Sequence, residues 1–284
     1  MKSFKFWCYK VRINNDGRPS IFEGDLLMQR YGMAIVAVFL GLISGCSNVT
    51  PKLAEGIREG QKQYARSNYI GAERILTGAI STDPDSPATA EAYYIRGLAR
   101  LKLMRPSVAK QDFQRALKRS EREDLRANAH VCLGSIAYDE GDWDAAYEHY
   151  RAAEKNLTFL SPSDWVLFRL ASSAQRSGRW DDGRKYYARI LREFPESETV
   201  RGARRNLNHS YFTIQVGAFS NAYGAYARVK DLQRAGLTAK VYTVLNNEGR
   251  SLKGVFIGRY NDYYQAVKGL AKVKRVVPEA RIVP

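Results

Sequence analysis

The stretch Gly141-Asp142-Trp143-Asp144-Ala145-Ala146-Tyr147-Glu148-His149-Tyr150-Arg151-Ala152-Ala153 belongs to a pattern that recurs every 37 residues in this 284-residue chain. Four series of residues share that spacing: Gly60, Gly97, Gly134 and Ala171; Ala72, Ala109, Ala146 and Gly183; Leu76, Phe113, Tyr150 and Tyr187; Ala79, Ala116, Ala153 and Ile190. Small residues let two helices approach closely, and a large residue fills the groove between them. The spacing predicts about four helix pairs over residues 53–200.

This stretch resembles the tetratricopeptide repeat (TPR), and so does Gly178-Arg179-Trp180-Asp181-Asp182-Gly183. Pro84 and Pro195 stand where the family places its helix-ending proline, whereas the second and third units have Glu121 and Thr158 there. The resemblance implies an α-solenoid whose concave surface holds a peptide or helix of a protein partner. The alternative is a spacer whose faces are only solvated.

A short polar segment separates the repeats from the rest of the chain. Residues 201–210 contain Arg204, Arg205 and the polar run Asn206–Ser210, after which the pattern changes from helical to alternating. We expect a hinge here, between a TPR domain at 53–200 and a second domain at 211–284.

The last 74 residues predict the element order βαββαβ. Strands are expected at Phe212–Val216, Ala239–Leu245, Leu252–Ile257 and Arg281–Val283, with a turn at 246–249. One helix is capped by Ser220 or Asn221 and buries Ala225, Val229 and Leu232; the other begins near Asp262 and buries Ala266, Leu270 and Val273. Two helices on one face of a four-stranded antiparallel sheet leave the other face open.

Two segments of this domain, Gln215–Ser220 and Val255–Tyr260, resemble the signature segments of the SPOR (sporulation-related repeat) domain. The resemblance covers residues 211–284 and implies a ferredoxin-like fold that binds septal peptidoglycan, at glycan strands whose stem peptides have been removed. Arg259-Tyr260 stands where Pro-Phe is common in the family. Leu252 and Gly254 stand where the family often has an aromatic residue and an arginine, so selectivity for bare glycan stays open.

The charge of the chain fits an anionic ligand of this kind. The formal net charge is +16, and residues 211–284 hold twelve Lys or Arg against four Asp or Glu. Strand parity predicts that Gln215, Tyr242, Phe256 and Lys240 share the open face of the sheet. A ring can pack on a sugar, an amide can bond its hydroxyl or N-acetyl groups, and lysine can meet a carboxylate. Our candidate glycan-binding residues are Gln215, Lys240, Tyr242, Lys253, Phe256 and Arg259. The alternative for Gln215 is a solvated strand amide, and for Phe256 a ring that only pairs across strands. The alternative for Lys240, Lys253 and Arg259 is a solvated basic surface.

An apolar run near the start of the chain predicts an export signal. Met33–Ile43 is an apolar run preceded by Arg30 and followed by Ser44 and Gly45, which is typical of a cleaved signal peptide and too short to span a membrane. The tetrad Ile43-Ser44-Gly45-Cys46 resembles the lipobox of bacterial lipoproteins. The resemblance implies that residues 28–45 are removed and that Cys46 is lipidated, with 46–52 as a tether. The alternative is an uncleaved signal anchor.

Residues 1–27 contain polar and acidic residues that no signal peptide needs, so we expect translation to start at Met28; a long, genuine leader from Met1 is the alternative. Ser47 replaces the aspartate that, by family analogy, retains lipoproteins at the inner membrane. We therefore expect an anchor in the outer membrane that faces the periplasm.

The chain shows none of the patterns that we associate with catalysis or cofactors. The three histidines, His130, His149 and His209, form no ligand-spaced pair, and there is no GxSxG or phosphate-cradling glycine loop. The three cysteines match neither a disulfide framework nor a zinc site, and Cys132 is expected in a helix core. We predict no enzyme, no metal, no cofactor and no nucleic-acid partner.

The sequence as a whole predicts a protein that is mainly α and then α+β. Its predicted function is that of a lipid-anchored envelope adaptor, which binds glycan strands and an unknown envelope protein. We expect it to act in cell division or wall remodelling. The alternative is an assembly factor for outer-membrane biogenesis or transport in which the repeats do the binding.

Overall fold

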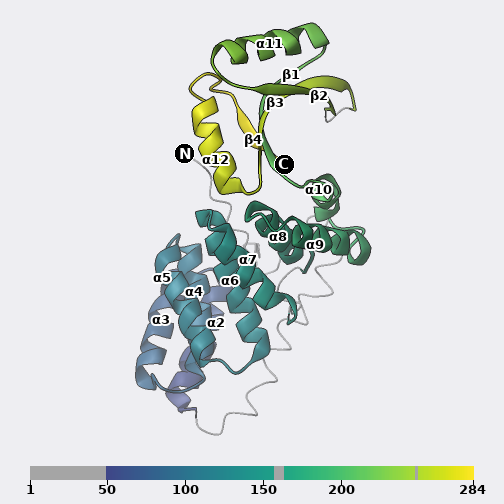
Figure 1. Ribbon diagram of the computed structural model, residues 1–284. Helices are drawn as coiled ribbons and strands as arrows, with labels where there is room; N and C mark the ends of the chain where they lie inside the picture. The colour runs from purple at the N-terminus through teal and green to yellow at the C-terminus, as the bar shows by residue number, and fades with distance from the viewer. Residues whose placement is uncertain (1–48, 157–162, 247–248) are drawn as a thin grey trace. The chain divides into compact units, whose positions relative to one another are not determined.

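The computed structural model describes residues 49–156, 163–246 and 249–284 (Figure 1). The chain divides into two compact units, Met1–Val166 and Leu167–Pro284. The division falls inside a helix of the fourth predicted repeat rather than at residues 201–210. Each unit is therefore described by itself.

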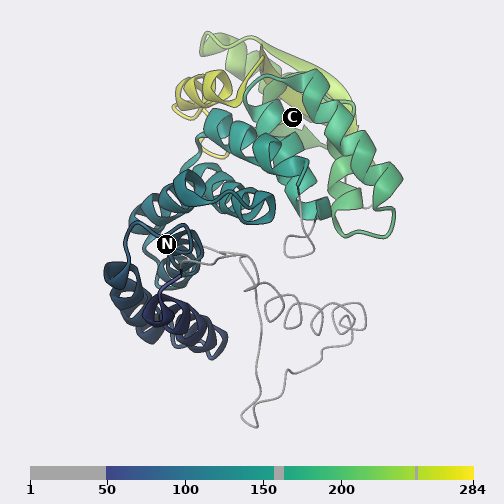
Figure 2. The same cartoon turned by 90° about the horizontal axis from the view of Figure 1, so that it is seen from below.

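The first unit is built from antiparallel helix pairs (Figures 1 and 2). Its helices are α2 (Pro51–Ala65), α3 (Tyr69–Thr82), α4 (Thr89–Lys102), α5 (Pro106–Arg119), α6 (Glu123–Glu140), α7 (Trp143–Glu154) and the first turn of α8 (Ser163–Arg176). The pairs are α2 with α3, α4 with α5 and α6 with α7, and the first two pairs each pack on the pair that follows. Helix α3 ends two residues before Pro84, as the sequence predicts.

The packing inside each pair follows the predicted spacing. A Cβ atom built on Gly97 would lie 2.8 Å from Cε1 of Phe113, and one on Gly134 would lie 3.0 Å from the ring of Tyr150. Both rings are fully buried. A side chain at either glycine would overlap the ring that fills the groove, so the small and the large residue are required together. Cys132 is buried in the core of this unit, as predicted.

A fifth residue series with the same spacing marks the turn inside each helix pair. Ser67, Met104, Gly141 and Gly178 stand 37 residues apart and all have positive φ, at 61°, 60°, 81° and 82°. This left-handed conformation disfavours any residue with a Cβ atom. The backbone of the turn is thus conserved between the pairs although only two of the four residues are glycine.

The second unit continues the helix pairs and ends in a sheet. After α8 come α9 (Trp180–Glu193), which ends two residues before Pro195, and α10 (Thr199–Asn206). The prediction of a hinge over 201–210 is wrong for its first part, because α10 is packed and bonded. Gly202 lies against the ring of Phe168, Gln175 donates to the carbonyl of Asn206 (2.8 Å), and Asn206 donates to the Tyr187 hydroxyl (3.2 Å).

The sheet has the predicted element order. Its strands are β1 (Phe212–Phe219), β2 (Ala239–Leu245), β3 (Ser251–Tyr260) and β4 (Arg281–Val283), with α11 (Ala222–Arg234) after β1 and α12 (Tyr263–Val273) after β3. The strands lie antiparallel in the order β2-β3-β1-β4. Asn221 and Asp262 cap the two helices through their side chains, as predicted.

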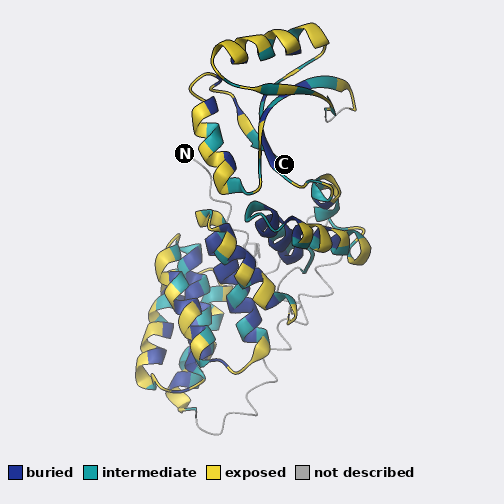
Figure 3. Ribbon diagram, viewed as in Figure 1, coloured by how far each residue is buried: buried dark blue, intermediate teal, exposed yellow. Residues whose placement is uncertain are grey.

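Both helices cover the same face of the sheet. The buried core beneath them is formed by Ile214, Val216, Ala225, Leu232, Val255, Ile257, Val273, Val277 and Ala280. The outward sides of α11 and α12 are exposed (Figure 3). Since side chains alternate along a strand, the residues between these core positions belong to the opposite, uncovered face.

An aromatic cluster joins the last helix pair to the sheet within the second unit. The Trp180 indole donates to the carbonyl oxygen of Asn261 (2.6 Å), and its ring centroid lies 4.9 Å from that of Phe212. The Arg176 guanidinium lies 4.5 Å from the centroid of the Tyr263 ring. Trp180, Phe212 and Ala266 form one buried cluster, so the helices of the last repeat and the sheet share a core.

The predicted upstream extension, the signal peptide and Cys46 lie outside the described residues. Across the parts of the chain that are described, no helix has the length and apolar character needed to cross a membrane.

Candidate functional site

Four side chains form a row across the uncovered face of the sheet. Lys240 on β2 stands opposite Phe256 on β3, Phe256 opposite Gln215 on β1, and Gln215 opposite Arg281 on β4. Residues that are directly opposite one another on neighbouring strands share a face and lie within contact distance. The row therefore combines a cation, a ring, an amide and a second cation.

Gln215 is held at the centre of this row by Arg281. The Oε1 atom of Gln215 accepts from Nε (3.1 Å) and Nη2 (2.9 Å) of Arg281. This contact occupies the amide oxygen and leaves the amide NH₂ group to donate to a ligand. Arg281 is exposed, so its guanidinium stays accessible on the same side. The pair offers both a donor for a carbonyl or hydroxyl and a charge for a carboxylate.

Two rings lie beside Lys240. Tyr242 is the next residue of β2 on this face, 43% exposed, and its ring centroid lies 6.0 Å from that of Phe256. Tyr242 stands opposite Gly254 in the sheet, and a Cβ atom on Gly254 would come within 2.5 Å of the Phe256 ring. The Phe256 ring thus occupies the place that a side chain at position 254 would take. The absence of the family's arginine at this position has a local reason, because a side chain there would displace the ring.

Lys253 and Arg259 are not part of the row. Lys253 has the strand parity of Val255 and Ile257, on the helix-covered side, and its Nζ donates to Thr243 (2.9 Å). Arg259 follows a β-bulge at Gly258 (φ 72°), and its guanidinium lies 4.3 Å from the centroid of the Tyr211 ring. The bulge reverses the alternation of β3, so Tyr260 packs against the core and Arg259 faces the uncovered side near the end of the strand. Strand parity brings together Gln215, Lys240, Tyr242 and Phe256. Lys253 lies on the helix-covered side, and Arg259 lies beyond the row, near the end of β3.

Arg281 is the member of the row that our choice of candidates omits. The sequence holds only a weak signal for it, the apolar Ile282 next to Arg281; in the structure Ile282 packs against the core, so Arg281 faces the other way. A three-residue strand gives too short an alternation to show this by itself. The pairing of β4 with β1 reveals it.

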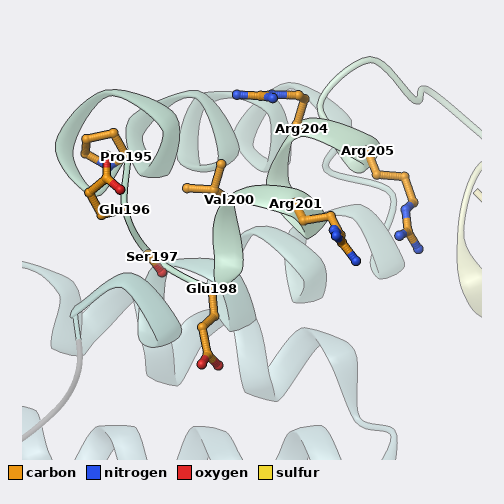
Figure 4. Close-up of a pocket in the computed structure, with 8 residues that line it drawn as sticks. All are labelled: Pro195, Glu196, Ser197, Glu198, Val200, Arg201, Arg204 and Arg205. Atoms are coloured by element: carbon orange, nitrogen blue, oxygen red, sulfur yellow. The ribbon is translucent and has the colours of Figure 1, made fainter. Parts of the chain in front are cut away.

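A hollow of about 750 Å³ lies between the end of α9 and α10 (Figure 4). Its lining comprises Pro195, Glu196, Ser197, Glu198, Val200, Arg201, Arg204 and Arg205. Arg201 and Arg205 point to one side, whereas Arg204 and Glu198 point away from them (Figure 4). The labelled charged groups do not converge on one point (Figure 4). The hollow adds basic surface to the second unit.

The comparison with protein families agrees with this arrangement. Residues 208–281 match the SPOR domain family, and residues 96–159 and 165–197 match two tetratricopeptide repeat families. The chain carries tetratricopeptide repeats and a C-terminal SPOR domain. A SPOR domain indicates peptidoglycan binding in the cell envelope, and TPRs indicate contact with another protein. Both are typically binding modules rather than catalysts.

Several solved structures resemble the chain at low identity. The structure of pilF from Pseudomonas aeruginosa is 18% identical and covers 64% of this chain and 77% of its own, with a TM-score of 0.47. The MamA protein is 17% identical and covers 55% of this chain and 79% of its own, with a TM-score of 0.46. A tetratricopeptide repeat protein from Parabacteroides merdae is 14% identical over 56% of this chain and 59% of that one, with a TM-score of 0.48. No curated protein matches the chain.

Proposed function

We propose that this protein is a non-enzymatic adaptor of the cell envelope, which binds peptidoglycan glycan strands with its SPOR sheet and a protein partner with its TPRs. The observation that supports the glycan part is the row Lys240, Phe256, Gln215 and Arg281, with Tyr242 beside it. The row crosses all four strands on the face that the helices leave uncovered.

The chemistry of the row fits a glycan without stem peptides. Removal of a stem peptide frees a lactyl carboxylate on alternate sugars, and the two ends of the row carry cations that can pair with such groups. The rings of Tyr242 and Phe256 offer apolar faces to the CH groups of a sugar. Gln215 offers an amide donor between them, which fits an N-acetyl carbonyl oxygen.

The anchor and the cellular role complete the proposal. Lipidation at Cys46 would hold the protein in the outer membrane facing the periplasm, with the SPOR domain reaching the wall. Preference for stem-peptide-poor wall would direct it to division or remodelling sites. The alternative is a TPR assembly factor for outer-membrane biogenesis or transport, in which the SPOR domain is only a weak wall tether.

The experiment is co-sedimentation of the full chain, in mild detergent, with purified cell-wall sacculi before and after amidase removal of stem peptides. We expect more protein in the pellet with treated sacculi. Tyr242→Ala should reduce this binding about tenfold through loss of a ring contact. Lys240→Ala should reduce it about threefold to fivefold, and more at low salt than at high salt.

Two matched variants control for charge and aromatic content. Lys253→Ala removes the same charge from the helix-covered side, and Tyr223→Ala removes a tyrosine that is 86% exposed on α11. Both should bind like the unaltered chain. If Lys253→Ala weakened binding as much as Lys240→Ala, and Tyr223→Ala as much as Tyr242→Ala, the SPOR domain would be only a non-specific basic surface. Binding that is the same before and after amidase treatment would mean the same. Either result would favour the TPR assembly factor.

A further inference from the structure

Two histidines of the first unit face each other across a helix pair. His130 on α6 and His149 on α7 bring their Nδ1 atoms within 3.1 Å, with ring centroids 5.3 Å apart and ring planes inclined by 42°. Both side chains are half-buried, so solvent and small ions can reach them. Neither Nε2 atom has a hydrogen-bond partner among the residues that the structure describes.

The helices hold this pair in place independently of the imidazoles. Gly134 and Tyr150 pack against each other in the same helix pair, and the Tyr150 hydroxyl lies 3.1 Å from the Ser135 hydroxyl. Each histidine is within four residues of these contacts in sequence. The packing of the two helices therefore brings the two imidazole side chains together.

The distance between the two Nδ1 atoms suits a shared metal ion. Imidazole nitrogen binds zinc at about 2.0–2.1 Å. At that length, two nitrogens 3.1 Å apart subtend an angle of about 100° at the metal, between the square-planar and the tetrahedral values. In the neutral pair one Nδ1 proton lies between the rings. Metal binding would move that proton to the Nε2 atom of the same ring and leave both Nδ1 lone pairs for the ion.

The charges around the pair permit a cation. Desolvation, followed by the neighbouring His130 and Lys110, lowers the pKa of His149 to about 4, while Asp142 and Glu148 oppose the shift. Desolvation and Arg126 also lower the pKa of His130. Two cationic and two anionic side chains thus act on the imidazoles, so the charges near the pair are balanced.

We propose that His130 and His149 form a two-imidazole site for a divalent transition-metal ion, with Cu²⁺ bound most tightly. Imidazole suits Zn²⁺, Ni²⁺ and Cu²⁺, and affinity at such a site rises toward Cu²⁺. No group of three or more His, Cys, Asp or Glu side chains surrounds a point in the described part of the chain. Water or a group from a bound partner would therefore fill the remaining coordination positions.

The test is a titration of the full chain, in chelator-free buffer at neutral pH, with Cu²⁺, Ni²⁺ and Zn²⁺ by calorimetry. We expect one Cu²⁺ per chain at this site and weaker binding of the other two ions. His130→Gln and His149→Gln should each weaken Cu²⁺ binding at least tenfold. His209→Gln is the matched control, because it removes the remaining histidine, in the second unit, and should bind as the unaltered chain does.

A second measurement needs no variant, and so does not depend on whether the variants fold. The electron paramagnetic resonance spectrum of the Cu²⁺-loaded chain should show coupling to two imidazole nitrogens. A spectrum with one imidazole or none, a titration without binding, or an affinity that both substitutions leave unchanged would overturn the site.

Discussion

Two neighbouring helix pairs place a polar side chain at the same repeat position but satisfy it differently. Asp112 in α4–α5 and His149 in α6–α7 stand 37 residues apart. Asp112 is fully buried and accepts from Arg96 (2.7 and 3.0 Å) and Arg100 (2.8 Å). His149 meets the neutral ring of His130. The repeat thus fixes where the side chain lies, while its partner on the preceding helix decides whether the pair is charged.

The difference matters for how each pair responds to change. A buried ion pair depends on both members, because the removal of one leaves the other charged and desolvated. Arg96, with 5% of its surface exposed, is such a member. The imidazole pair carries no charge at neutral pH but can acquire one as the pH falls. The first pair should be sensitive to mutation, and the second to pH.

The largest effect is expected from Asp112→Ala. It leaves Arg96 buried without its carboxylate, so the free energy of unfolding of the first unit should fall by about 3–5 kcal/mol, as measured by urea denaturation. Asp181→Ala is the control: Asp181 also pairs with an arginine, but 82% of its side chain is exposed, and the change should stay within about 0.5 kcal/mol. Similar losses for both variants would contradict the comparison.

The next effect is a pH dependence specific to α6–α7. The unfolded chain binds protons at His149 near its ordinary pKa of 6.5, whereas the folded chain does so only near 4. Stability is therefore fully present above about pH 6.5 and is lost as the pH falls toward 4. Because the His149 side chain is only half-buried, solvent screens part of this pKa shift.

We expect a loss of about 1 kcal/mol between roughly pH 7 and pH 5.5, measured by urea denaturation at each pH. The double variant His130→Phe, His149→Leu should flatten this slope, and His209→Gln should reduce it only by that residue's own share, since burial also lowers the pKa of His209. A slope that the double variant leaves unchanged would place the titration elsewhere.

The smallest effect concerns the turns that join the helices of each pair. Met104 and Gly141 adopt the same left-handed conformation, and the Met104 side chain is 54% exposed, so it contributes little packing. Met104→Gly should raise the free energy of unfolding by about 0.5 kcal/mol, because relief of backbone strain exceeds the entropy cost of glycine. The measurement is the melting temperature, which should rise accordingly. Gly141→Ala should change it in the opposite direction. The same sign for both would contradict a shared turn geometry.

The sequence predicted the helix pairs and the sheet because their signals are local and repeated. The series through Gly97 and Phe113 names the residues that touch, and Asn221 and Asp262 mark the helix starts. The left-handed turn series has no signature in the sequence, because backbone geometry alone links residues as different as Ser67 and Met104. Local composition cannot reveal that similarity.

The candidate site was predictable only where strand alternation is regular. Parity places Gln215 with Phe256, but the bulge at Gly258 reverses the side-chain alternation of β3 before Arg259. The supposed hinge failed for a different reason. Arg204 and Arg205 make the segment look solvated, yet contacts from distant Phe168 and Gln175 hold it as a helix. Such tertiary contacts have no signature in the segment itself.

The shared cluster of Trp180 and Phe212 has a consequence for how this protein can be divided and recombined. Both side chains are more than nine-tenths buried although one belongs to a repeat and the other to the SPOR sheet. A cut between them would leave an aromatic patch on each fragment, prone to self-association. A chimaera that exchanges the SPOR domain for another should place its junction before α8, so that the last repeat and the sheet are transferred together.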